Sequence, residues 1–245
     1  MLTSIRGLVA ASLIAGAGLA ATPAVAQEAG DFSISGNAAI VTQYRFRGVG
    51  LSDGDIAVQG GVDIAHSSGF YIGTWGSSLD EGDGTGYGHT ELDIYGGWSG
   101  DLAEGVSADV GVLYYVYPNA HVLAGDTDYV EFYGSLGYSL GPVDTTVGVA
   151  YAPDQDSLGS QDNLYLYGDA SVGIPGTPVT LNGHVGYTDG VLAVTNDGTS
   201  WDWLVGADFA VSENLSLGVS YVGVEGKGTN GFDDDAVVGT LSVSF

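Results

Sequence analysis

Residues 106–112 read Val-Ser-Ala-Asp-Val-Gly-Val, with an apolar side chain at every second position and Ser, Asp or Gly between them. A period of two is the period of a β-strand, because successive side chains of a strand point to opposite faces. The same alternation runs through residues 201–209 and 215–221 and through the chain end, 237–245, which closes on Phe245. The sequence therefore predicts an all-β protein.

Segments of this kind follow one another from residue 33 to the C-terminus. Most have about the 9–11 residues that a tilted strand needs to cross a bilayer. Their number, twelve, is even, as in single-chain bacterial outer-membrane barrels, and a sheet in lipid must close because no edge can stay unpaired. We therefore expect a transmembrane antiparallel up-and-down β-barrel of about 12 strands. The predicted strands are 33–49, 56–67, 69–79, 90–100, 106–117, 128–139, 143–153, 162–174, 179–189, 201–212, 215–225 and 235–245.

The connections between these strands alternate in length. Short turns are expected at 67–68, 141–142, 176–177 and 213–214, and 101–105 is of middling length. Apart from a shorter first one at 50–55, the other connections are longer: 80–89, 118–127, 154–161, 190–200 and 226–234. Outer-membrane barrels have short periplasmic turns and long external loops. Both termini are therefore expected on the periplasmic side.

The first 26 residues have the pattern of a cleaved signal peptide. Arg6 is their only charge, an apolar run follows from Leu8 to Ala20, and Ala24-Val25-Ala26 matches a small-residue cleavage site. The run is short and rich in Ala and Gly, which disfavours a membrane anchor. We expect residues 27–245 to form a single barrel domain in the outer membrane of a Gram-negative bacterium.

Composition excludes several classes of protein. The chain has 30 acidic and 4 basic residues, a net charge of −26, and no cysteine. Four basic residues cannot neutralise a nucleic-acid backbone, and neither a disulfide scaffold nor a cysteine-ligated metal site is possible. The 11% aromatic content disfavours a disordered acidic tail.

Aromatic residues recur near the predicted strand ends, where barrels carry girdles at the membrane interfaces. The girdle prediction covers Tyr44, Phe46, Phe70, Trp75, Tyr95, Trp98, Tyr114, Tyr115, Tyr117, Tyr129, Phe132, Tyr138, Trp201 and Trp203.

Four segments resemble a known family. They are 42–48 (Thr-Gln-Tyr-Arg-Phe-Arg-Gly), 57–63 (Ala-Val-Gln-Gly-Gly-Val-Asp), 68–75 (Ser-Gly-Phe-Tyr-Ile-Gly-Thr-Trp) and 91–97 (Glu-Leu-Asp-Ile-Tyr-Gly-Gly). They resemble the TorF-type porin family of Gram-negative outer-membrane proteins, specifically over 40–97 and loosely beyond. The usual serine after Arg-Gly is displaced to Ser52. The resemblance implies an outer-membrane barrel with a pore and a final strand, ending in Phe245, that the barrel assembly machinery reads; it identifies no solute.

The polar register of each strand predicts the lumen side chains. The first strand is expected to point Ile40, Tyr44 and Phe46 outward. The predicted lumen residues are Asn37, Gln43, Arg45, Arg47, Gln59, Asp63, Glu91, Asp93, Asp109, Glu131, Asp144, Asp169, His184, Asp202 and Asp208.

Two hypotheses about the role of these lumen residues remain. Arginines facing carboxylates could form a constriction whose field filters solutes, or side-chain pairs could fill a barrel of this size as a plug. The first reading makes the protein a porin for passive diffusion of small hydrophilic solutes, with a preference for cations because the lumen and loops are acidic.

The sequence leaves two other functions open. An outer-membrane hydrolase needs a base such as His beside a nucleophile; the candidates are His66, His89, His121 and His184, and no Ser-His-Asp spacing stands out. A structural or adhesive barrel without a pore is the third hypothesis. The acidic runs 80–83 and 233–235 lack a calcium-loop signature and are expected to be solvated, so no metal and no cofactor are predicted. The expected partners are membrane lipid, lipopolysaccharide, small solutes and a possible second copy of the chain.

Overall fold

A computed structural model describes residues 27–80, 86–120, 125–228 and 231–245. Its wall consists of twelve antiparallel strands, which confirms the expected up-and-down barrel of the transmembrane type. The wall strands are β2 (Phe32–Val41), β5 (Ala57–His66), β6 (Phe70–Ser78), β7 (Thr90–Ala103), β8 (Val106–Val116), β9 (Tyr129–Leu140), β10 (Val143–Gln155), β11 (Gln161–Gly173), β12 (Val179–Gly190), β13 (Thr199–Ala210), β14 (Leu215–Val224) and β15 (Ala236–Ser244).

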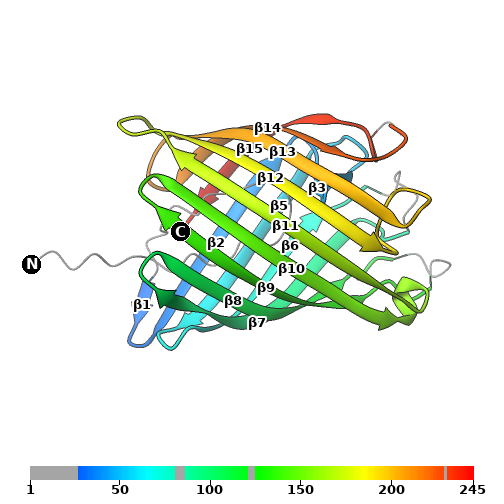
Figure 1. The fold of residues 1–245 in the computed structure, drawn as a ribbon, viewed down its shortest axis with the longest axis horizontal. Coiled ribbons are helices and arrows are strands. Elements are labelled where there is room, and N and C mark those ends of the chain that lie inside the picture. Colours follow the sequence, from blue (N-terminus) through cyan, green and yellow to red (C-terminus); the bar gives the residue numbers. More distant parts are fainter. Residues whose placement is uncertain (1–26, 81–85, 121–124, 229–230) are drawn as a thin grey trace, which may run out of the picture.

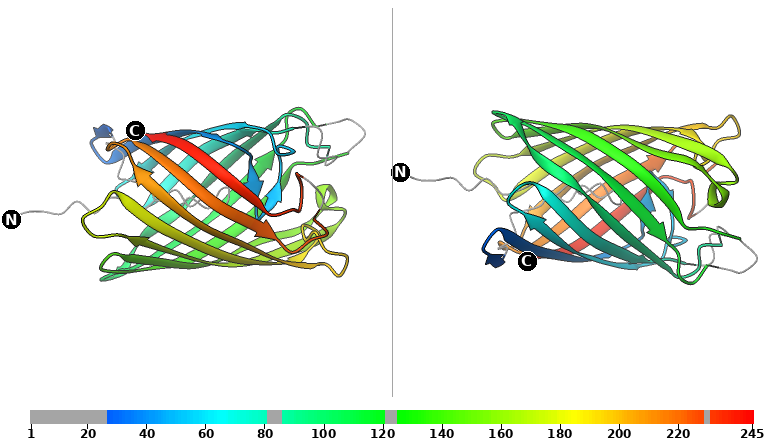
Figure 2. Two further views of the ribbon diagram at one scale, coloured as in Figure 1. Left: turned by 90° about the horizontal axis from the view of Figure 1, so that it is seen from above. Right: turned by 90° about the horizontal axis from the view of Figure 1, so that it is seen from below.

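Strand β2 closes the barrel, because it pairs with β5 on one side and with the last strand, β15, on the other. In Figures 1 and 2 the blue start of the chain lies beside the red end, and the strands run obliquely around the barrel axis. Short β1 (Gln27–Ala29) pairs with the start of β2. Phe245 then exchanges two backbone hydrogen bonds with Gly36, and its ring lies where a side chain at Gly36 would stand. Both ends of the barrel domain are thus at the same end of the cylinder.

Side chains alternate along the wall as the sequence predicts. Large apolar residues such as Val110, Phe132 and Val205 are exposed on the outside, at every second position of their strands. The intervening side chains face the lumen. Such an apolar outer surface would be unstable in water and fits the hydrocarbon layer of a membrane.

The two ends of the barrel differ. At the end we call the turn end, the connections are 67–69, 104–105, 141–142, 174–178 and 211–214. At the other end, the loop end, the connections are 42–56, 79–89, 117–128, 156–160, 191–198 and 225–235. The connection expected at 154–161 is shorter than predicted, because β10 extends to Gln155 and a single 3₁₀ turn, η3 (Asp156–Leu158), completes the link.

The first predicted strand is wrong beyond residue 41. β2 ends at Val41, and the chain leaves the wall and forms a small inward hairpin, β3 (Arg45–Phe46) and β4 (Val49–Gly50). Tyr44 therefore does not face outward: its side chain is 1% exposed. Polar and apolar side chains do alternate along residues 43–47, but these residues belong to a hairpin inside the barrel and not to a wall strand.

About half of the residues predicted to form aromatic girdles at the membrane interfaces do not lie on the outer surface. Phe70, Tyr114, Phe132, Tyr138 and Trp201 are exposed on the outer surface. Seven of the others lie inside the barrel: Tyr44, Phe46, Trp75, Tyr95, Tyr115, Tyr117 and Tyr129. The wall residues of this second set share the register of lumen-facing neighbours, so the strand period decides their direction and position near a strand end does not. Trp98 and Trp203 are partly buried and share the register of outward-facing neighbours.

The predicted signal peptide, residues 1–26, lies outside the described residues. Within the part of the chain that the structure describes, no helix is long and apolar enough to span a membrane.

Candidate functional site

The tip of the inward hairpin is a tight turn. Phe46 pairs with Val49, and the two residues between them, Arg47 and Gly48, have φ values of 48° and 79°. Positive φ at both central positions is the pattern of a type I′ turn, whose twist suits a two-residue hairpin. A Cβ at Gly48 would lie 2.6 Å from the carbonyl oxygen of Gly223, so the glycine also permits close packing against β14.

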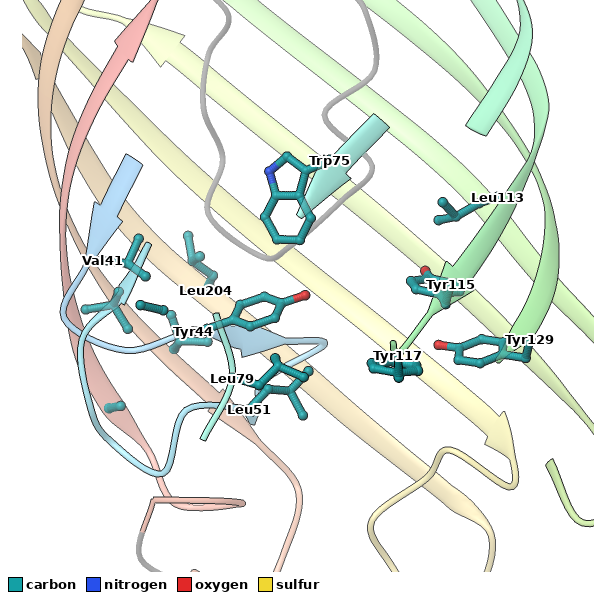
Figure 3. Close-up of a cluster of buried hydrophobic side chains, with 14 of the residues drawn as sticks. Val41, Tyr44, Leu51, Trp75, Leu79, Leu113, Tyr115, Tyr117, Tyr129 and Leu204 are labelled. Atoms are coloured by element: carbon teal, nitrogen blue, oxygen red, sulfur yellow. The ribbon is translucent and has the colours of Figure 1, made fainter. Parts of the chain in front are cut away.

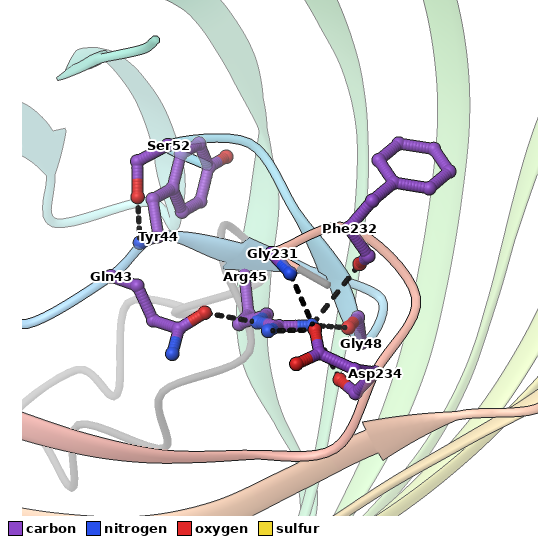
Figure 4. A network of polar contacts seen from close by, with 8 residues as sticks. All are labelled: Gln43, Tyr44, Arg45, Gly48, Ser52, Gly231, Phe232 and Asp234. Carbon is purple, nitrogen blue, oxygen red and sulfur yellow. Dashed lines mark hydrogen bonds and ion pairs between the residues drawn. The ribbon is translucent and has the colours of Figure 1, made fainter. Parts of the chain in front are cut away.

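Arg45 fastens the hairpin to the loop between β14 and β15 (Figure 4). Its Nη1 donates to the carbonyl oxygens of Gly48, Phe232 and Asp234 at 2.8–3.1 Å, and its Nη2 donates to the Asp234 carboxylate at 3.0 Å. Its Nε donates to Gln43 Oε1 at 2.7 Å. Arg45 is 4% exposed. Because all three nitrogens of the planar guanidinium are hydrogen-bonded, Arg45 fixes both the position and the orientation of the hairpin.

Arg47 reaches the opposite wall of the barrel. Its Nη2 donates to both carboxylate oxygens of Glu131 on β9, at 2.8 and 2.7 Å, and its guanidinium lies 4.1 Å from the ring centre of Tyr165 on β11. Burial lowers the pKa of Arg47, but the Glu131 carboxylate outweighs it and the net pKa is above the ordinary value, so the side chain stays charged. The hairpin therefore bridges the lumen between its two faces.

Tyr44 makes a third attachment at the base of the hairpin. Its hydroxyl donates to Glu91 Oε1 on β7 at 2.8 Å, and its backbone N–H donates to Ser52 Oγ at 2.9 Å. Desolvation, reinforced by Glu91, raises the pKa of this phenol far above its usual range. Tyr44 is held as a neutral donor.

An apolar cluster surrounds the hairpin at the loop end. Figure 3 shows Tyr44, Trp75 and Tyr115 pointing into the space that the strands enclose. The rings of Tyr115 and Tyr129 stack with centroids 4.3 Å apart. Aromatic packing of this kind inside the barrel narrows the lumen at the loop end.

Buried carboxyl groups lie beside this cluster. Asp93 is 0% exposed, and neither of its oxygens has a hydrogen-bond partner among the described residues. Glu91 Oε2, the oxygen that does not contact Tyr44, also has no hydrogen-bond partner among the described residues. Unpaired buried carboxyl oxygens are rare, because desolvation without a partner is costly.

The other half of the lumen is lined by carboxyl groups that tyrosine hydroxyls hold against the wall. Tyr95 donates to Asp63 Oδ1 at 2.6 Å, and Tyr71 donates to Asp109 Oδ1 at 2.7 Å. Tyr71 also contacts the hydroxyl of Tyr133. Asn182 donates to Asp208 Oδ2 at 2.5 Å. These side-chain pairs connect residues of neighbouring and nearby wall strands in the turn-end half of the lumen.

His184 lies between two aspartates. Its Nδ1 is 2.6 Å from Asp169 Oδ1, its Nε2 is 2.9 Å from Asp202 Oδ1, and Tyr165 completes the group at 2.9 Å from Nε2. All these partners are wall residues of β11 and β13. In the described residues no serine or threonine hydroxyl is hydrogen-bonded to this ring.

Inward glycines make room for the lumen tyrosines. The ring of Tyr95 covers Gly73, that of Tyr133 covers Gly111, and Tyr167 covers Gly148, each on the neighbouring strand. A Cβ at any of these glycines would meet the ring. Part of the high glycine content thus serves to fit aromatic rings inside a narrow barrel.

The predicted lumen residues fall into three groups. Gln43, Arg45 and Arg47 lie on the hairpin and not on a wall strand, which corrects their predicted strand. The wall residues that are buried are Gln59, Glu91, Asp93, Asp109, Glu131 and Asp202. Those only partly covered are Asn37, Asp63, Asp169, His184 and Asp208, while Asp144 is exposed at the turn-end rim, where Ser139 donates to it at 2.5 Å.

The acidic run 233–235 is not simply solvated, contrary to expectation. Asp233 is buried and accepts the backbone N–H of Lys227 at 2.7 Å, Asp234 pairs with Arg45, and Asp235 accepts from Tyr221 at 2.5 Å. Most of the 80–83 run lies outside the described residues, as does His121. Among the residues that are described, no group of three or more His, Asp or Glu could hold a metal ion.

Sequence reasoning missed the lumen tyrosines, above all Tyr71, Tyr95 and Tyr133, and the partner of Arg45. The signal for the tyrosines was present: Tyr95 follows Asp93 by two residues and Tyr133 follows Glu131 by two, so each must share its neighbour's face. No local signal indicates Asp234, since it lies 189 residues from Arg45.

The comparisons with known proteins agree with this architecture. The family model described as "Bacterial protein of unknown function (Gcw_chp)" matches residues 25–245. The chain belongs to this family. No curated protein matches the sequence.

Two solved structures share the fold of this Gcw_chp family member. One, described as a NanC porin, superposes with a TM-score of 0.59 at 10% identity over 86% of this chain and 98% of its own. The other, the COG4313 outer membrane channel from Pseudomonas putida F1, gives a TM-score of 0.52 at 10% identity over 89% and 96%. At such identity the likeness establishes the fold alone.

Proposed function

We propose that this protein is an outer-membrane channel of a Gram-negative bacterium, through which small hydrophilic solutes diffuse passively with a preference for cations. One observation carries the proposal: a closed barrel with an apolar exterior encloses a polar, acidic lumen that a loop-derived hairpin narrows at one end. The similarity to a porin and to a channel of similar length supports it. The TorF-type resemblance of residues 40–97 points the same way.

The preference for cations follows from unequal pairing of charges. Residues 27–245 contain three basic side chains, Arg45, Arg47 and Lys227. Both arginines are already paired with carboxylates. The acids of the turn-end half, among them Asp63, Asp109 and Asp208, accept hydrogen bonds from neutral donors, so no positive side chain offsets their charge. A low-dielectric wall focuses such a field into the lumen.

The constriction is proposed to be the hairpin itself, which unites the two readings of the lumen. It fills the loop-end half as a plug would, while its attachments leave the acidic wall of the turn-end half free. We propose a channel and not an enzyme, because the hydrogen bonds of His184 are to carboxylates and a phenol.

The orientation and partners belong to the same proposal. The turn end and both termini would be periplasmic, the loop end would face lipopolysaccharide outside, and the assembly machinery would read the strand that ends at Phe245. Association with further copies of the chain is compatible with the exposed apolar wall.

Planar-bilayer recording of the purified protein tests the proposal. We expect discrete conductance steps and, across a potassium chloride gradient, a reversal potential of the sign given by a cation-preferring pore. Absence of steps from folded protein contradicts the channel. Steps with an anion-preferring reversal potential contradict the charge argument alone.

A further inference from the structure

Both ring nitrogens of His184, in the middle of β12, lie against carboxylate oxygens. Nδ1 is 2.6 Å from Asp169 Oδ1, and Nε2 is 2.9 Å from Asp202 Oδ1. A neutral imidazole has one N–H and one lone pair, so its second nitrogen would point a lone pair at an ionised carboxylate. An imidazolium donates a hydrogen bond from each nitrogen, and the two contacts therefore indicate a protonated ring.

The hydroxyl of Tyr165 is consistent with the same assignment. It lies 2.9 Å from His184 Nε2 and 3.2 Å from Asp202 Oδ1. A phenol has one hydrogen to donate. If that hydrogen goes to Asp202, Nε2 needs a hydrogen of its own, as it has in an imidazolium. All three groups are then hydrogen-bonded without a contact between two acceptors.

Asp202 also needs a positive partner. Its side chain is 4% exposed, and its Oδ2 has no hydrogen-bond partner among the described residues. A buried carboxylate without an opposite charge is strongly destabilised. Arg47 does not supply this charge, because its Nη2 is bound to Glu131. His184 is in direct contact with Asp202 and supplies the charge only in its protonated form.

The titratable and charged groups that face His184 come from β11, β13 and the hairpin. They are Tyr165, Tyr167, Asp169, Asp202 and Arg47. The two tyrosine rings lie 6.4 and 6.2 Å from the ring of His184, and Arg47 lies on the Tyr165 ring with its charge offset by Glu131. The charges in direct contact with His184 are therefore the two carboxylates, and both attract an imidazolium.

This group lies beside the constriction that the hairpin is proposed to form. Tyr165 stands between His184 and Arg47 at the hairpin tip and contacts both. The side chains of His184 and Asp169 are 17% and 44% exposed. Because these side chains face the lumen, their charges act on the ions inside it.

We propose that His184 is a specificity-determining residue of the channel. Its imidazolium, held between Asp169 and Asp202, is a positive charge in addition to the three arginine and lysine charges of residues 27–245, and it limits the preference for cations. The inference rests on the proposed function, because ion selectivity requires a conducting lumen. Loss of the proton at high pH makes the group of three side chains more negative by one charge, so the preference for cations should increase as the pH rises.

Reversal potentials in planar bilayers across a potassium chloride gradient test the charge. At about pH 7, His184→Gln should raise the ratio of potassium to chloride permeability about two- to fivefold, because one positive charge fewer acts on the lumen. His184→Lys keeps a positive charge and should keep the ratio of the unchanged protein. The matched control is His66→Gln, since His66 lies at the turn end with its ring against the exposed Phe32, and it should have no effect.

The pH profile separates a charged ring from a structural one. Between about pH 6 and about pH 10 the permeability ratio of the unchanged protein should rise more than that of His184→Gln. Other groups, such as Lys227, titrate in both proteins and cancel in the comparison.

Nitrogen NMR observes the ring directly and needs no current. The full protein, labelled with ¹⁵N-histidine and reconstituted in lipid nanodiscs, should show both nitrogens of His184 at imidazolium positions at about pH 7. The signal is assigned by its absence from His184→Gln. Circular dichroism checks that each variant remains a folded barrel.

The outcomes separate this residue from the channel as a whole. A neutral His184 ring at that pH, or an unchanged permeability ratio in folded His184→Gln, overturns the inference and leaves the channel standing. Absence of conductance steps from the unchanged protein refutes the channel, and the role of His184 in selectivity with it, even where NMR shows a protonated ring.

Discussion

At the scale of single residues, two arginines and a few glycines decide how the lumen is filled. Arg45 and Arg47 carry two of the three positive charges beyond residue 26, and both form ion pairs that hold the hairpin in place. Glycines opposite the lumen tyrosines provide the space that aromatic rings need. Both features are matters of contact geometry, so they can be tested by single substitutions.

Replacing Arg45 with alanine should release the hairpin. The change removes five hydrogen bonds from a buried side chain, among them those to the carbonyls of Gly48, Phe232 and Asp234. We expect the free energy of unfolding in lipid vesicles to fall by about 1–3 kcal/mol. Lys227→Ala, which removes the same charge from an exposed position of the connection 225–235, is the control. Equal loss in both variants would mean that the anchor is only an effect of charge.

Gly97→Ala tests the close packing of the lumen. The new Cβ would meet the backbone carbonyl oxygen of Val110 and would lie 2.8 Å from the hydroxyl of Tyr71. Backbone cannot yield as a side chain does, so a cost of about 1–3 kcal/mol is expected in urea titrations. At Gly183, also on a wall strand, a Cβ meets nothing within 4 Å, and Gly183→Ala should change the stability by less than about 0.5 kcal/mol. Similar stabilities for the two variants would contradict the packing.

At the scale of elements, one wall strand ends early and the residues after it take on another role. β2 stops at Val41, and the chain up to residue 56 contains the inward hairpin, while β2 still closes the barrel through β5 and β15. The wall strands themselves each present an apolar outer face, and the position of a residue along a strand sets its depth in the membrane.

Depth can be measured by placing lysine on the outer face. Val110 lies in the middle of β8 and is 54% exposed, so Val110→Lys should cost about 2–4 kcal/mol of folding free energy in lipid. Val58 is the second residue of β5, near the membrane boundary, and Val58→Lys should cost only about 0–1 kcal/mol. If lysine is tolerated equally at both positions, the apolar outer band is not where we place it.

The hairpin as an element should control the current. Exchanging residues 44–51 for a Gly-Ser linker of equal length removes the three attachments of the hairpin, to β7, to β9 and to the connection 225–235, while leaving the wall strands intact. Single-channel conductance in planar bilayers should then rise, because the filled half of the lumen opens. An unchanged conductance in a folded variant would show that the narrowest point lies elsewhere.

At the scale of the whole molecule, the proposed preference for cations depends on how charge is distributed in the lumen. The acids of the turn-end half lie on several wall strands around the lumen, and Asp63 and Asp109 are held there by neutral phenols. The field they create is a collective property, since no single carboxylate determines it.

Neutralising that field should reduce the preference for cations. The quadruple variant changes four lumen acids to asparagine: Asp63, Asp109, Asp169 and Asp208. Its reversal potential in a salt gradient should move toward zero. The control removes the same number of charges from exposed positions at the turn end: Asp31, Asp101, Glu104 and Glu213. Equal shifts in both variants would assign the preference to net charge and not to the lumen.

The sequence by itself determined the architecture and the direction of most wall side chains. Alternation is a consequence of strand geometry at each residue, so residues 106–112 or 215–221 reveal their two faces without any partner. The same rule places Asp93, Asp109 and His184 inside, and the need to pair every edge in lipid requires the sheet to close.

Only the tertiary structure decided which alternating segment leaves the wall. Residues 43–47 alternate as well as any wall strand, but Arg45 finds Asp234, and Arg47 finds Glu131 and Tyr165, across the closed barrel. Those contacts join residues 84 to 189 positions apart. Local periodicity carries no information about such pairs, because they exist only once the cylinder has formed and brought its opposite walls within reach of one side chain.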